Sequence, residues 1–283
     1  MPPKIASATQ ANQSMERTLQ VLSVFTAESP TVRVSDVAAR CGLGMSTSSR
    51  LLVTLVAAGF VQRNPDGSHQ LGHRLVALAG TALNSSQVYR ESRNIAYAMS
   101  CELGLGVNVA ELRDGHVFYL LNFDGRHAPR TVTLMGQSYP LHATGLGRCL
   151  LLGLDPAERD SVLGPDPFPS YTTRTIIDRR ELSAELERIS AQGYAVESEE
   201  IGFSRACVAA PIRDRTGSVA AAISVSGPLS VLRLGKREPE LSQAVIEAAD
   251  AISTALGAIA HARNTYSHTH KSGDQRNPKE ATV

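Results

Sequence analysis

The sequence contains no tryptophan, only four cysteines and no long hydrophobic run. No 18 consecutive residues are apolar, so we expect no transmembrane helix. The start, Met1-Pro2-Pro3-Lys4, leads into no apolar segment and is not a secretory signal peptide. The cysteines lack metal-type spacing, which favours reduced, partly buried thiols at Cys41, Cys101, Cys149 and Cys207. These absences predict a cytoplasmic protein without a metal or other cofactor.

An excess of charge of one sign is also missing. Lys and Arg number 28 against 27 Asp and Glu, so the net charge of +1 gives no sign of nucleic-acid binding. The distribution says more, because residues 1–80 hold seven basic side chains, Lys4, Arg17, Arg33, Arg40, Arg50, Arg63 and Arg74. The same residues include only four acidic side chains. This small local excess of positive charge favours contact with phosphates. A length of 283 residues suggests two domains.

Two short helices separated by a glycine are predicted near the N-terminus, after a first helix that starts at Ser14 and stops at 28–30. Ser35 is a suitable N-cap for the second helix, and Gly42 ends it. The third helix runs from about Met45 to Ala58. Such a pair is the helix-turn-helix that places its second helix in a DNA major groove.

A wing is predicted next. Residues 60–63 and 69–71 are strand-like, and Asn64-Pro65-Asp66-Gly67 between them is a strong turn signal. Helices are then expected over 74–83 and 85–103, with a break at Gly80 or at 84–86. This part of the sequence predicts a winged helix-turn-helix followed by a linker helix.

The remaining sequence predicts an α+β domain. Strands are expected at 107–112 and 116–122, joined by Asp114-Gly115, and at 207–212 and 219–226 around a turn. Helices are expected at 145–152, 182–192 and 239–261. The fold class is therefore α+β, with two domains of different kind.

The third helix has two chemically distinct sides at 100° per residue. One side carries the apolar residues that must face the domain core, and the other carries Ser46, Thr47, Arg50 and Thr54. Hydroxyls and a guanidinium suit base edges and phosphates, although an isolated helix face of this kind is usually only solvated. The neighbouring helix and wing favour DNA.

Further DNA contacts are expected around this helix. Arg63 at the base of the wing is a candidate for a phosphate or minor-groove contact, and Arg17 and Arg40 are weaker phosphate candidates. Ser48 is included with the hydroxyls of the third helix. One such module is small, so we expect two copies to read pseudo-palindromic double-stranded DNA.

The chain resembles the IclR family of bacterial transcriptional regulators over nearly its whole length. The resemblance rests on ordered segments at 14–22, 46–55, 59–61, 71–72, 140–148, 193–195 with 199–200, 207–212 and 223–228. It implies a winged helix-turn-helix, a linker helix and a GAF-like effector domain, assembled as a homodimer or homotetramer. The expected boundaries are a disordered arm at 1–13, the DNA-binding domain at 14–74, the linker at 75–84, the effector domain at 85–263 and a disordered tail at 264–283.

An effector pocket is expected on the strand that holds Ser224 and Ser226, because residues two apart point to one face. Their hydroxyls need partners, either neighbouring backbone or a ligand. The resemblance favours a ligand and implies further pocket residues: Thr144, Gly145, Leu146, Glu197 and Cys207. The family usually has Asp where Glu197 stands, so Glu197 suits a ligand with a hydroxyl or amide, or is itself protonated. Tyr139 lies either at the opening or packed on the surface.

The resulting hypothesis is a ligand-responsive transcriptional regulator, with repression the commoner mode in the family and a small organic or aromatic acid as the effector. An enzyme is the alternative, with Cys207, His142 and Glu197 as nucleophile, base and orienting group. No nucleophile motif surrounds Cys207, which disfavours catalysis. A metal or redox sensor would use the cysteines and the histidines His261, His268 and His270.

Overall fold

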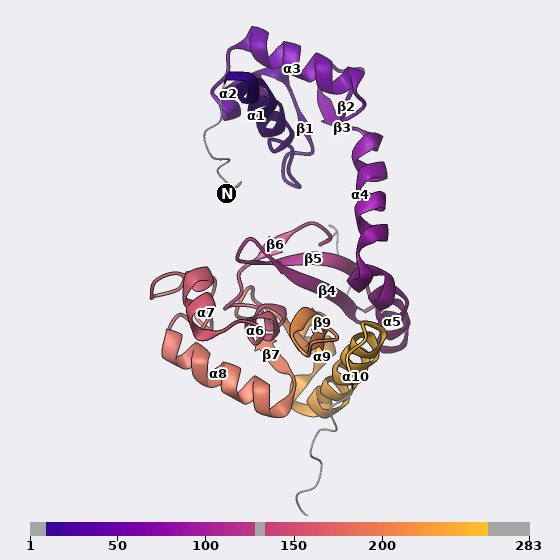
Figure 1. The fold of residues 1–283 in the computed structure, drawn as a ribbon, viewed down its shortest axis with the longest axis vertical. Coiled ribbons are helices and arrows are strands. Elements are labelled where there is room, and N and C mark those ends of the chain that lie inside the picture. Colours follow the sequence, from indigo (N-terminus) through magenta and orange to yellow (C-terminus); the bar gives the residue numbers. More distant parts are fainter. Residues whose placement is uncertain (1–9, 128–133, 260–283) are drawn as a thin grey trace, which may run out of the picture.

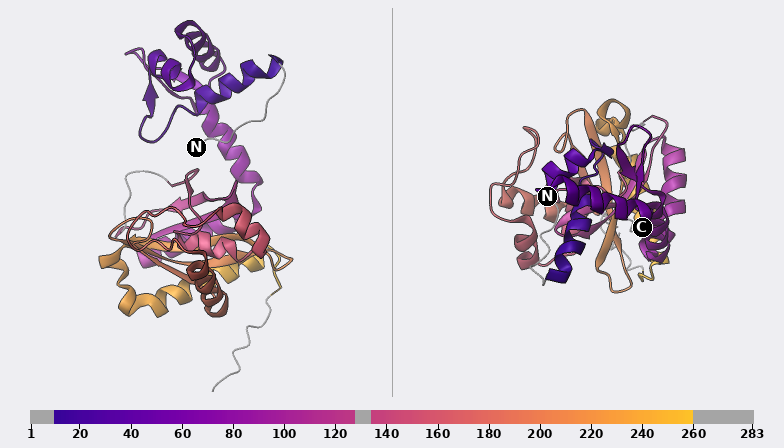
Figure 2. Two further views of the ribbon diagram at one scale, coloured as in Figure 1. Left: turned by 90° about the vertical axis from the view of Figure 1, so that its left-hand side faces the viewer. Right: turned by 90° about the horizontal axis from the view of Figure 1, so that it is seen from above.

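The computed structural model describes residues 10–127 and 134–259. It consists of a small N-terminal head and a larger C-terminal domain, joined by a helix that stands between them (Figures 1 and 2). Residues 1–9 and 260–283, which hold most of the expected arm and all of the expected tail, lie outside the described part.

The head is a winged helix-turn-helix. It contains α1 (Gln10–Leu22), β1 (Thr31–Val32), α2 (Val34–Cys41), α3 (Met45–Ala57), β2 (Val61–Arg63) and β3 (His69–Leu71). The strands form one sheet in the order β1-β3-β2, and the predicted turn closes with a Gly67 N–H to Asn64 carbonyl bond of 3.0 Å. Val21, Val37 and Leu52 lie in its buried core. The predicted fold class is confirmed for this part of the chain.

The limits predicted for the first helix were wrong at both ends. Helix α1 begins at Gln10, so the last part of the predicted arm is helical. Ser14 is inside the helix rather than at its cap, and its carbonyl accepts a hydrogen bond from Thr18 Oγ1 at 2.7 Å. The helix ends at Leu22, where the Ser23 hydroxyl bonds back to the Gln20 carbonyl at 2.8 Å. Local side-chain to backbone bonds therefore decide the end before Pro30 is reached.

Helix α2 also starts differently from the prediction. Its N-cap is Arg33, and the Asp36 carboxylate accepts the Arg33 backbone N–H at 2.7 Å. An acidic side chain in the first turn thus replaces the Ser35 cap that the sequence favoured. The other end agrees with the prediction, because Gly42 has φ 63° and closes the helix in the left-handed region.

The linker helix is α4 (His73–Ser85), and α5 (Gln87–Leu103) follows it directly as the first helix of the C-terminal domain. The break lies at Ser86, whose hydroxyl caps α5 by accepting the Tyr89 N–H at 3.2 Å. Gly80 does not break the helix and lies inside α4. No residue of α4 is buried in the single chain, and even its apolar residues Val76 and Leu78 are exposed.

We expect Gly80→Ala to stabilise the chain by about 0.5–1 kcal/mol, because Gly80 is helical and an added Cβ meets no atom within 4 Å. The control is Gly72→Ala, whose Cβ would clash with the Gly59 carbonyl oxygen and should destabilise the junction of head and linker. Urea unfolding of both variants measures the difference. Equal effects of the two substitutions would contradict this account of the linker.

The C-terminal domain is built on one antiparallel sheet in the order β6-β5-β4-β9-β8-β7. Its strands are listed from one edge to the other: β6 (Ser138–Tyr139), β5 (His116–Phe123), β4 (Gly106–Arg113), β9 (Val219–Pro228), β8 (Arg205–Arg213) and β7 (Ala195–Ser198). The hairpin of β4 and β5 and the pairing of β8 with β9 agree with the predicted strands. The edge strands β6 and β7 were not predicted, because each has too few residues to show alternation.

Helices cover both faces of this sheet (Figure 1). One face packs against α5 and α10 (Leu234–Ala255), and the other packs against α6 (Gly145–Leu151) and α8 (Arg179–Gln192). Short α7 (Pro156–Leu163) and α9 (Leu229–Leu232) complete the domain and were not predicted. Helix α10 starts five residues before the predicted Pro239 and contains that proline. The observed domain is α+β, as expected.

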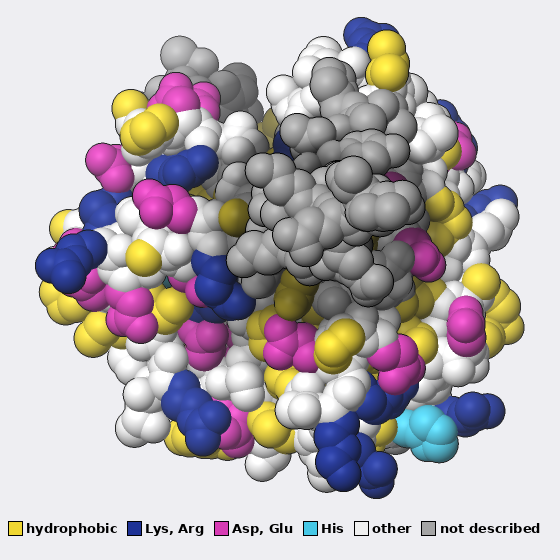
Figure 3. Space-filling model, turned by 90° about the horizontal axis from the view of Figure 1, so that it is seen from below, with side chains coloured by type: hydrophobic (Ala, Val, Ile, Leu, Met, Phe, Trp, Pro, Cys, Tyr) yellow, Lys and Arg dark blue, Asp and Glu magenta, His cyan; other side chains and the backbone are white. Residues whose placement is uncertain are grey.

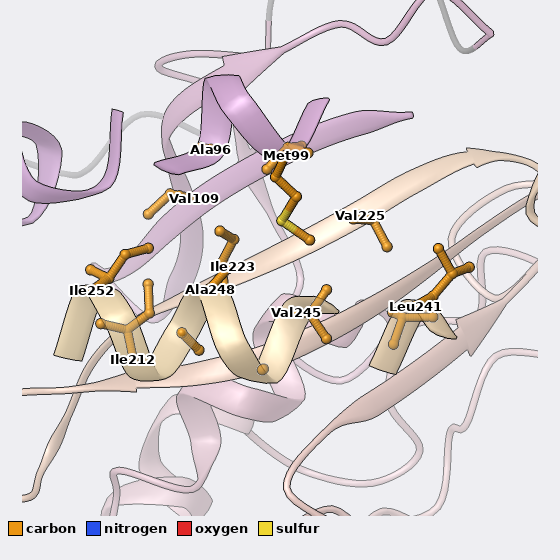
Figure 4. Packing of buried hydrophobic residues seen from close by; sticks show 14 of the residues in the cluster. Ala96, Met99, Val109, Ile212, Ile223, Val225, Leu241, Val245, Ala248 and Ile252 are labelled. Carbon is orange, nitrogen blue, oxygen red and sulfur yellow. The ribbon is translucent and has the colours of Figure 1, made fainter. Parts of the chain in front are cut away.

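The core beneath α10 is continuous across three elements (Figure 4). Val245 and Ile252 of α10 lie over Ile223 of β9, and Met99 of α5 closes the cluster from the side. On the side away from the head, acidic and basic side chains are interspersed on the described surface (Figure 3). Among the described residues, no helix is both long and apolar enough to cross a membrane.

Candidate functional site

The outer face of α3 presents most of the predicted DNA contacts to solvent. Ser46, Arg50 and Thr54 are exposed, and Thr47 is half-buried. The Thr54 hydroxyl donates to the Arg50 carbonyl at 3.0 Å, which leaves its oxygen free to act only as an acceptor toward solvent or a partner. Arg63 is exposed at the end of β2, beside the wing turn. The four α3 positions share one side of the helix, together with the exposed apolar side chain of Val53.

Two of the predicted DNA contacts make hydrogen bonds within the head. Ser48 is fully buried and its hydroxyl donates to the Gly44 carbonyl at 3.2 Å, so its prediction as a DNA contact was wrong. It lies on the core side of the helix because it precedes Leu52 by one turn. Arg40 donates to the Val24 carbonyl at 3.1 Å and to the Ser29 hydroxyl at 3.0 Å, which ties α2 to the loop after α1.

The wing is anchored by a pair that the sequence did not indicate. Arg33 lies at the start of α2, and its guanidinium donates to the Asp66 carbonyl at 3.3 Å and lies 3.6 Å from the Asp66 carboxylate. Both side chains are largely exposed, so the pair orients the wing tip more than it stabilises the fold. Arg17 is exposed on α1, as a phosphate contact requires.

The predicted effector residues come together around one cavity of about 180 Å³ in the C-terminal domain. Seven of them line it: Tyr139, Thr144, Leu146, Glu197, Cys207, Ser224 and Ser226. The eighth, Gly145, lies directly behind, where an added Cβ would come within 2.9 Å of the Cys207 sulfur. Pockets for drug-sized ligands measure roughly 300–1,000 Å³, so a cavity of this size suits a ligand smaller than those.

The cavity lining also includes residues that were not predicted from the sequence. Asn108 comes from β4, Tyr119 from β5, and Arg205 from the start of β8. Tyr119 and Tyr139 stack edge to face with ring centroids 5.3 Å apart, which places Tyr139 at the cavity rather than on the outer surface. Asn108 lies on β4 directly opposite Ser224, a pairing that only the register of the folded sheet reveals.

The start of α6 offers fewer open amides than expected. The Gly147 N–H is bonded to Thr144 Oγ1 at 3.0 Å, and the Arg148 N–H to the Thr144 carbonyl at 3.0 Å. The Gly145 backbone faces the Cys207 thiol and lowers its pKa, against the larger opposite effect of burial. Thr144 therefore caps this helix from within the protein. The polar side chains of the sheet, rather than the helix start, supply the larger part of the pocket chemistry.

Glu197 is buried at the far side of the pocket, on β7 opposite Cys207. One carboxylate oxygen accepts the Glu200 backbone N–H at 2.7 Å and the Ile201 N–H at 3.4 Å. Burial raises the pKa of the Glu197 carboxyl, and the nearby Glu200 carboxylate adds to the effect. Protonation of this side chain is therefore easier than for an exposed glutamate.

This shift makes stability depend on pH in a defined direction. The folded chain holds the Glu197 proton to a higher pH than the unfolded chain, so the free energy of unfolding falls as pH rises above the ordinary pKa of 4.5. Gln carries no such proton. We expect the stability of Glu197→Gln relative to wild type to rise as the pH is increased through the range above 4.5. Urea unfolding across this range measures it, and a constant difference would contradict the assignment.

Cys207 is unsuited to nucleophilic catalysis. Burial raises the pKa of its thiol well above the ordinary value, and the Glu197 carboxylate raises it further. A thiol in this state is not the thiolate that attacks substrates. The proposed base, His142, instead bonds through Nε2 to the Pro169 carbonyl at 2.9 Å, and burial lowers its pKa. The three residues of the enzyme alternative thus lack the arrangement of a catalytic triad.

A buried ion pair supports the pocket from behind. Arg148 of α6 is 1% exposed, and its guanidinium bonds to the Glu200 carboxylate, whose side chain is 10% exposed. It also donates to the His142 carbonyl at 3.0 Å and the Val196 carbonyl at 3.4 Å. The Thr175 hydroxyl donates to the Glu200 carbonyl at 2.6 Å. This cluster fixes the loop after β7 that closes one side of the pocket.

The metal-sensor alternative has no support in the described part of the chain. Residues 10–127 and 134–259 contain no group of three or more His, Cys, Asp and Glu side chains that could hold an ion. The histidines named for that alternative, His261, His268 and His270, lie outside the described residues.

Comparison with known proteins agrees with this architecture. Residues 14–65 match the model of the IclR helix-turn-helix domain, and residues 80–254 match that of the bacterial transcriptional regulator IclR C-terminal domain. The chain is 30% identical to the HTH-type transcriptional regulator XynR of Escherichia coli, over 87% of this chain and 97% of XynR. It is 32% identical to the HTH-type transcriptional repressor AllR of the same species, over 90% and 94%.

Solved structures show the same fold. An IclR homologue from Microbacterium hydrocarbonoxydans, in complex with 4-hydroxybenzoate, has a TM-score of 0.76 and 27% identity, covering 86% of this chain and 98% of that one. Thermotoga maritima IclR has a TM-score of 0.71 and 25% identity, covering 87% and 99%. With a winged head, a linker helix and a pocketed α+β domain in one polypeptide, the chain belongs to the IclR family of bacterial transcriptional regulators.

Proposed function

We propose that this regulator is a cytoplasmic repressor that a small organic acid releases from its operator. The observation that supports the proposal most is that Ser224, Ser226, Cys207 and Glu197 line one cavity. This cavity lies in the same polypeptide as the DNA-binding head. The relative AllR is a repressor, and a structural neighbour holds 4-hydroxybenzoate. An aromatic or other small acid is accordingly the class of effector we favour here.

The DNA partner is a pseudo-palindromic duplex read by two heads. Arg50 is the central contact on α3, with Ser46 and Thr47 beside it and Arg63 reaching from the wing. The apolar side chains of Val76 and Leu78 on α4 are exposed to solvent in the single chain. Burial of these side chains between two copies supports assembly as a homodimer or a pair of dimers. The domain boundaries we propose are 14–74 for the head, 75–84 for the linker and 85–263 for the effector domain.

The proposed mechanism is a shift between two arrangements of the dimer. A ligand changes operator affinity only by the difference in its affinity for the two arrangements. Helices α4 and α5 connect the pocket domain to the head, and β4, which carries Asn108, packs against α5. The chain has no catalytic role in this proposal, because burial raises the pKa of the Cys207 thiol and so disfavours the thiolate.

Two measurements on the full chain test the proposal. The first is a thermal-shift screen of small acids, in which a true effector stabilises the protein by RT ln(1 + [L]/Kd). The second is footprinting on DNA that flanks the protein's own gene, where we expect two protected half-sites about one helical turn apart. Sequence-selective protection that the stabilising acid leaves unchanged would contradict release by effector.

A further inference from the structure

A line of side-chain hydrogen bonds crosses the floor of the pocket. Asn122 Nδ2 donates to Asn108 Oδ1 at 3.0 Å. Asn108 Nδ2 in turn donates to Ser226 Oγ at 3.0 Å and to Ser224 Oγ at 3.3 Å. The residues lie on neighbouring strands, with Asn122 opposite Asn108 and Asn108 opposite Ser224 in the sheet register. This row joins the two serines to a residue two strands away.

The hydrogen bonds in this row all run in one sense, from donor groups on Asn122 and Asn108 toward the serine hydroxyls. The Asn108 oxygen is occupied by Asn122, so its NH₂ group faces the serines. A hydroxyl that accepts an N–H keeps its own hydrogen for donation. The Ser224 hydroxyl is thereby set to donate into the pocket, toward an atom that only accepts. A carboxylate or ketone oxygen is such an atom.

Burial makes this direction costly to reverse. Asn108 is 1% exposed, so its amide cannot exchange a lost protein partner for bulk water. Turning Asn108 around would bring its NH₂ group against the Asn122 NH₂ group unless Asn122 turned as well. Asn122 is half-buried outside the pocket lining, so it holds Asn108 from behind without touching the ligand.

The charges around the pocket agree with an accepting ligand at the serine end. Arg205 brings a positive charge to the lining. The negative group, Glu197, lies across β8 from the serines, and one of its oxygens is already bonded to the Glu200 and Ile201 amides. An acid placed with its carboxylate at Ser224 avoids the glutamate and gains a donor.

We propose that Asn108, oriented by Asn122, is a positioning residue that makes Ser224 a hydrogen-bond donor and so selects effectors presenting a carboxylate or ketone oxygen to this end of the pocket. The inference rests on the proposed function and deepens it, because it names the atoms that distinguish an acid from an amine. It also assigns a role to two asparagines that were not among the predicted site residues.

Asn108→Asp tests the polarity with almost no change in shape. Its carboxylate accepts from both serines and from Asn122, so it draws the Ser224 hydrogen away from the ligand. The probes are 4-hydroxybenzoate and pyruvate as acids, 4-hydroxyacetophenone as a neutral acceptor and 4-hydroxybenzylamine as a donor. Calorimetry on the full wild-type chain should show that an acceptor probe binds and that the amine binds more weakly.

In Asn108→Asp we expect each acceptor probe that binds, the neutral ketone included, to lose about tenfold or more in affinity, the worth of one hydrogen bond to a charged group. The amine should not weaken. A loss confined to the acids would indicate charge repulsion and overturn the proposal. So would a wild-type preference for the amine, or failure of all three acceptor probes to bind the wild-type chain.

Asn122→Asp provides a second variant that leaves the lining intact. Its carboxylate only accepts, so it forces Asn108 to turn its NH₂ group away from the serines, and the same loss is expected. Asn122→Ala is the matched control, since it removes the anchor without forcing reversal and should have a smaller effect. Wild-type acceptor affinity in Asn122→Asp would overturn the proposal. Footprinting tests the proposed function separately. Protected DNA together with a pocket that prefers the amine would contradict the proposed donor role of Ser224 but not the regulatory function.

Discussion

Arg148→Met should lower the free energy of unfolding by about 3–5 kcal/mol, the typical cost of leaving one member of a buried ion pair without its partner. The substitution keeps much of the side-chain volume but removes the guanidinium that neutralises Glu200. It also removes donors to the His142 and Val196 carbonyls. Urea unfolding of the effector domain measures the effect.

The chain provides a matched control for this prediction. Arg237 of α10 makes a two-pronged bond to Glu240, at 2.7 and 2.9 Å, but the Glu240 side chain is about half exposed. Arg237→Met should therefore cost about 1 kcal/mol or less. Equal costs for the two variants would contradict the account. The double variant Arg148→Met with Glu200→Leu should recover part of the loss, because it leaves no buried charge unpaired.

Arg50→Ala should abolish most of the sequence-selective DNA affinity. Arg50 is exposed on the outer face of α3, where a guanidinium can pair with a guanine or a phosphate. A good bidentate contact is worth about 1–3 kcal/mol, and a dimer makes the contact twice. We expect a loss of about 10- to 100-fold for each contact, measured by fluorescence anisotropy on the footprinted duplex.

The control for Arg50→Ala removes the same charge at a site away from the head. Arg93 is exposed on α5, so Arg93→Ala should leave operator affinity nearly unchanged. Salt titration adds a second readout, since loss of a phosphate contact lowers the slope of log affinity against log salt. If Arg93→Ala weakened binding as much as Arg50→Ala, α3 would not be the reading helix.

Local patterns predicted the head well. The helix pair, the end of α2 at Gly42 and the Asn64–Gly67 turn depend on residues that are close in sequence. Residue type and spacing were therefore enough to predict them. The end of α1 and the start of α2 were misplaced because Ser23 and Asp36 compete for backbone groups that the sequence assigns equally well to other caps. Ser48 was misassigned because a small hydroxyl side chain fits either side of a helix.

The pocket shows where sequence reasoning ends. Ser224 and Ser226 were found from their spacing on one strand, and Glu197 and Cys207 from the family resemblance. Asn108 was missed because its role depends on the register of β4 against β9, more than a hundred residues away in sequence. The Arg148–Glu200 pair was missed for the same reason, since its partners are 52 positions apart and neither lies in a motif for ion pairing.

The most direct test of the account measures operator affinity of the full chain while an acid that stabilises it is titrated in. We expect operator affinity to fall as the acid occupies the pocket, with a midpoint near its own Kd, and we expect Ser224→Ala to shift that midpoint without changing affinity for DNA alone. Operator affinity that stays constant at saturating acid, with occupancy confirmed by calorimetry, would contradict the coupling of pocket and head.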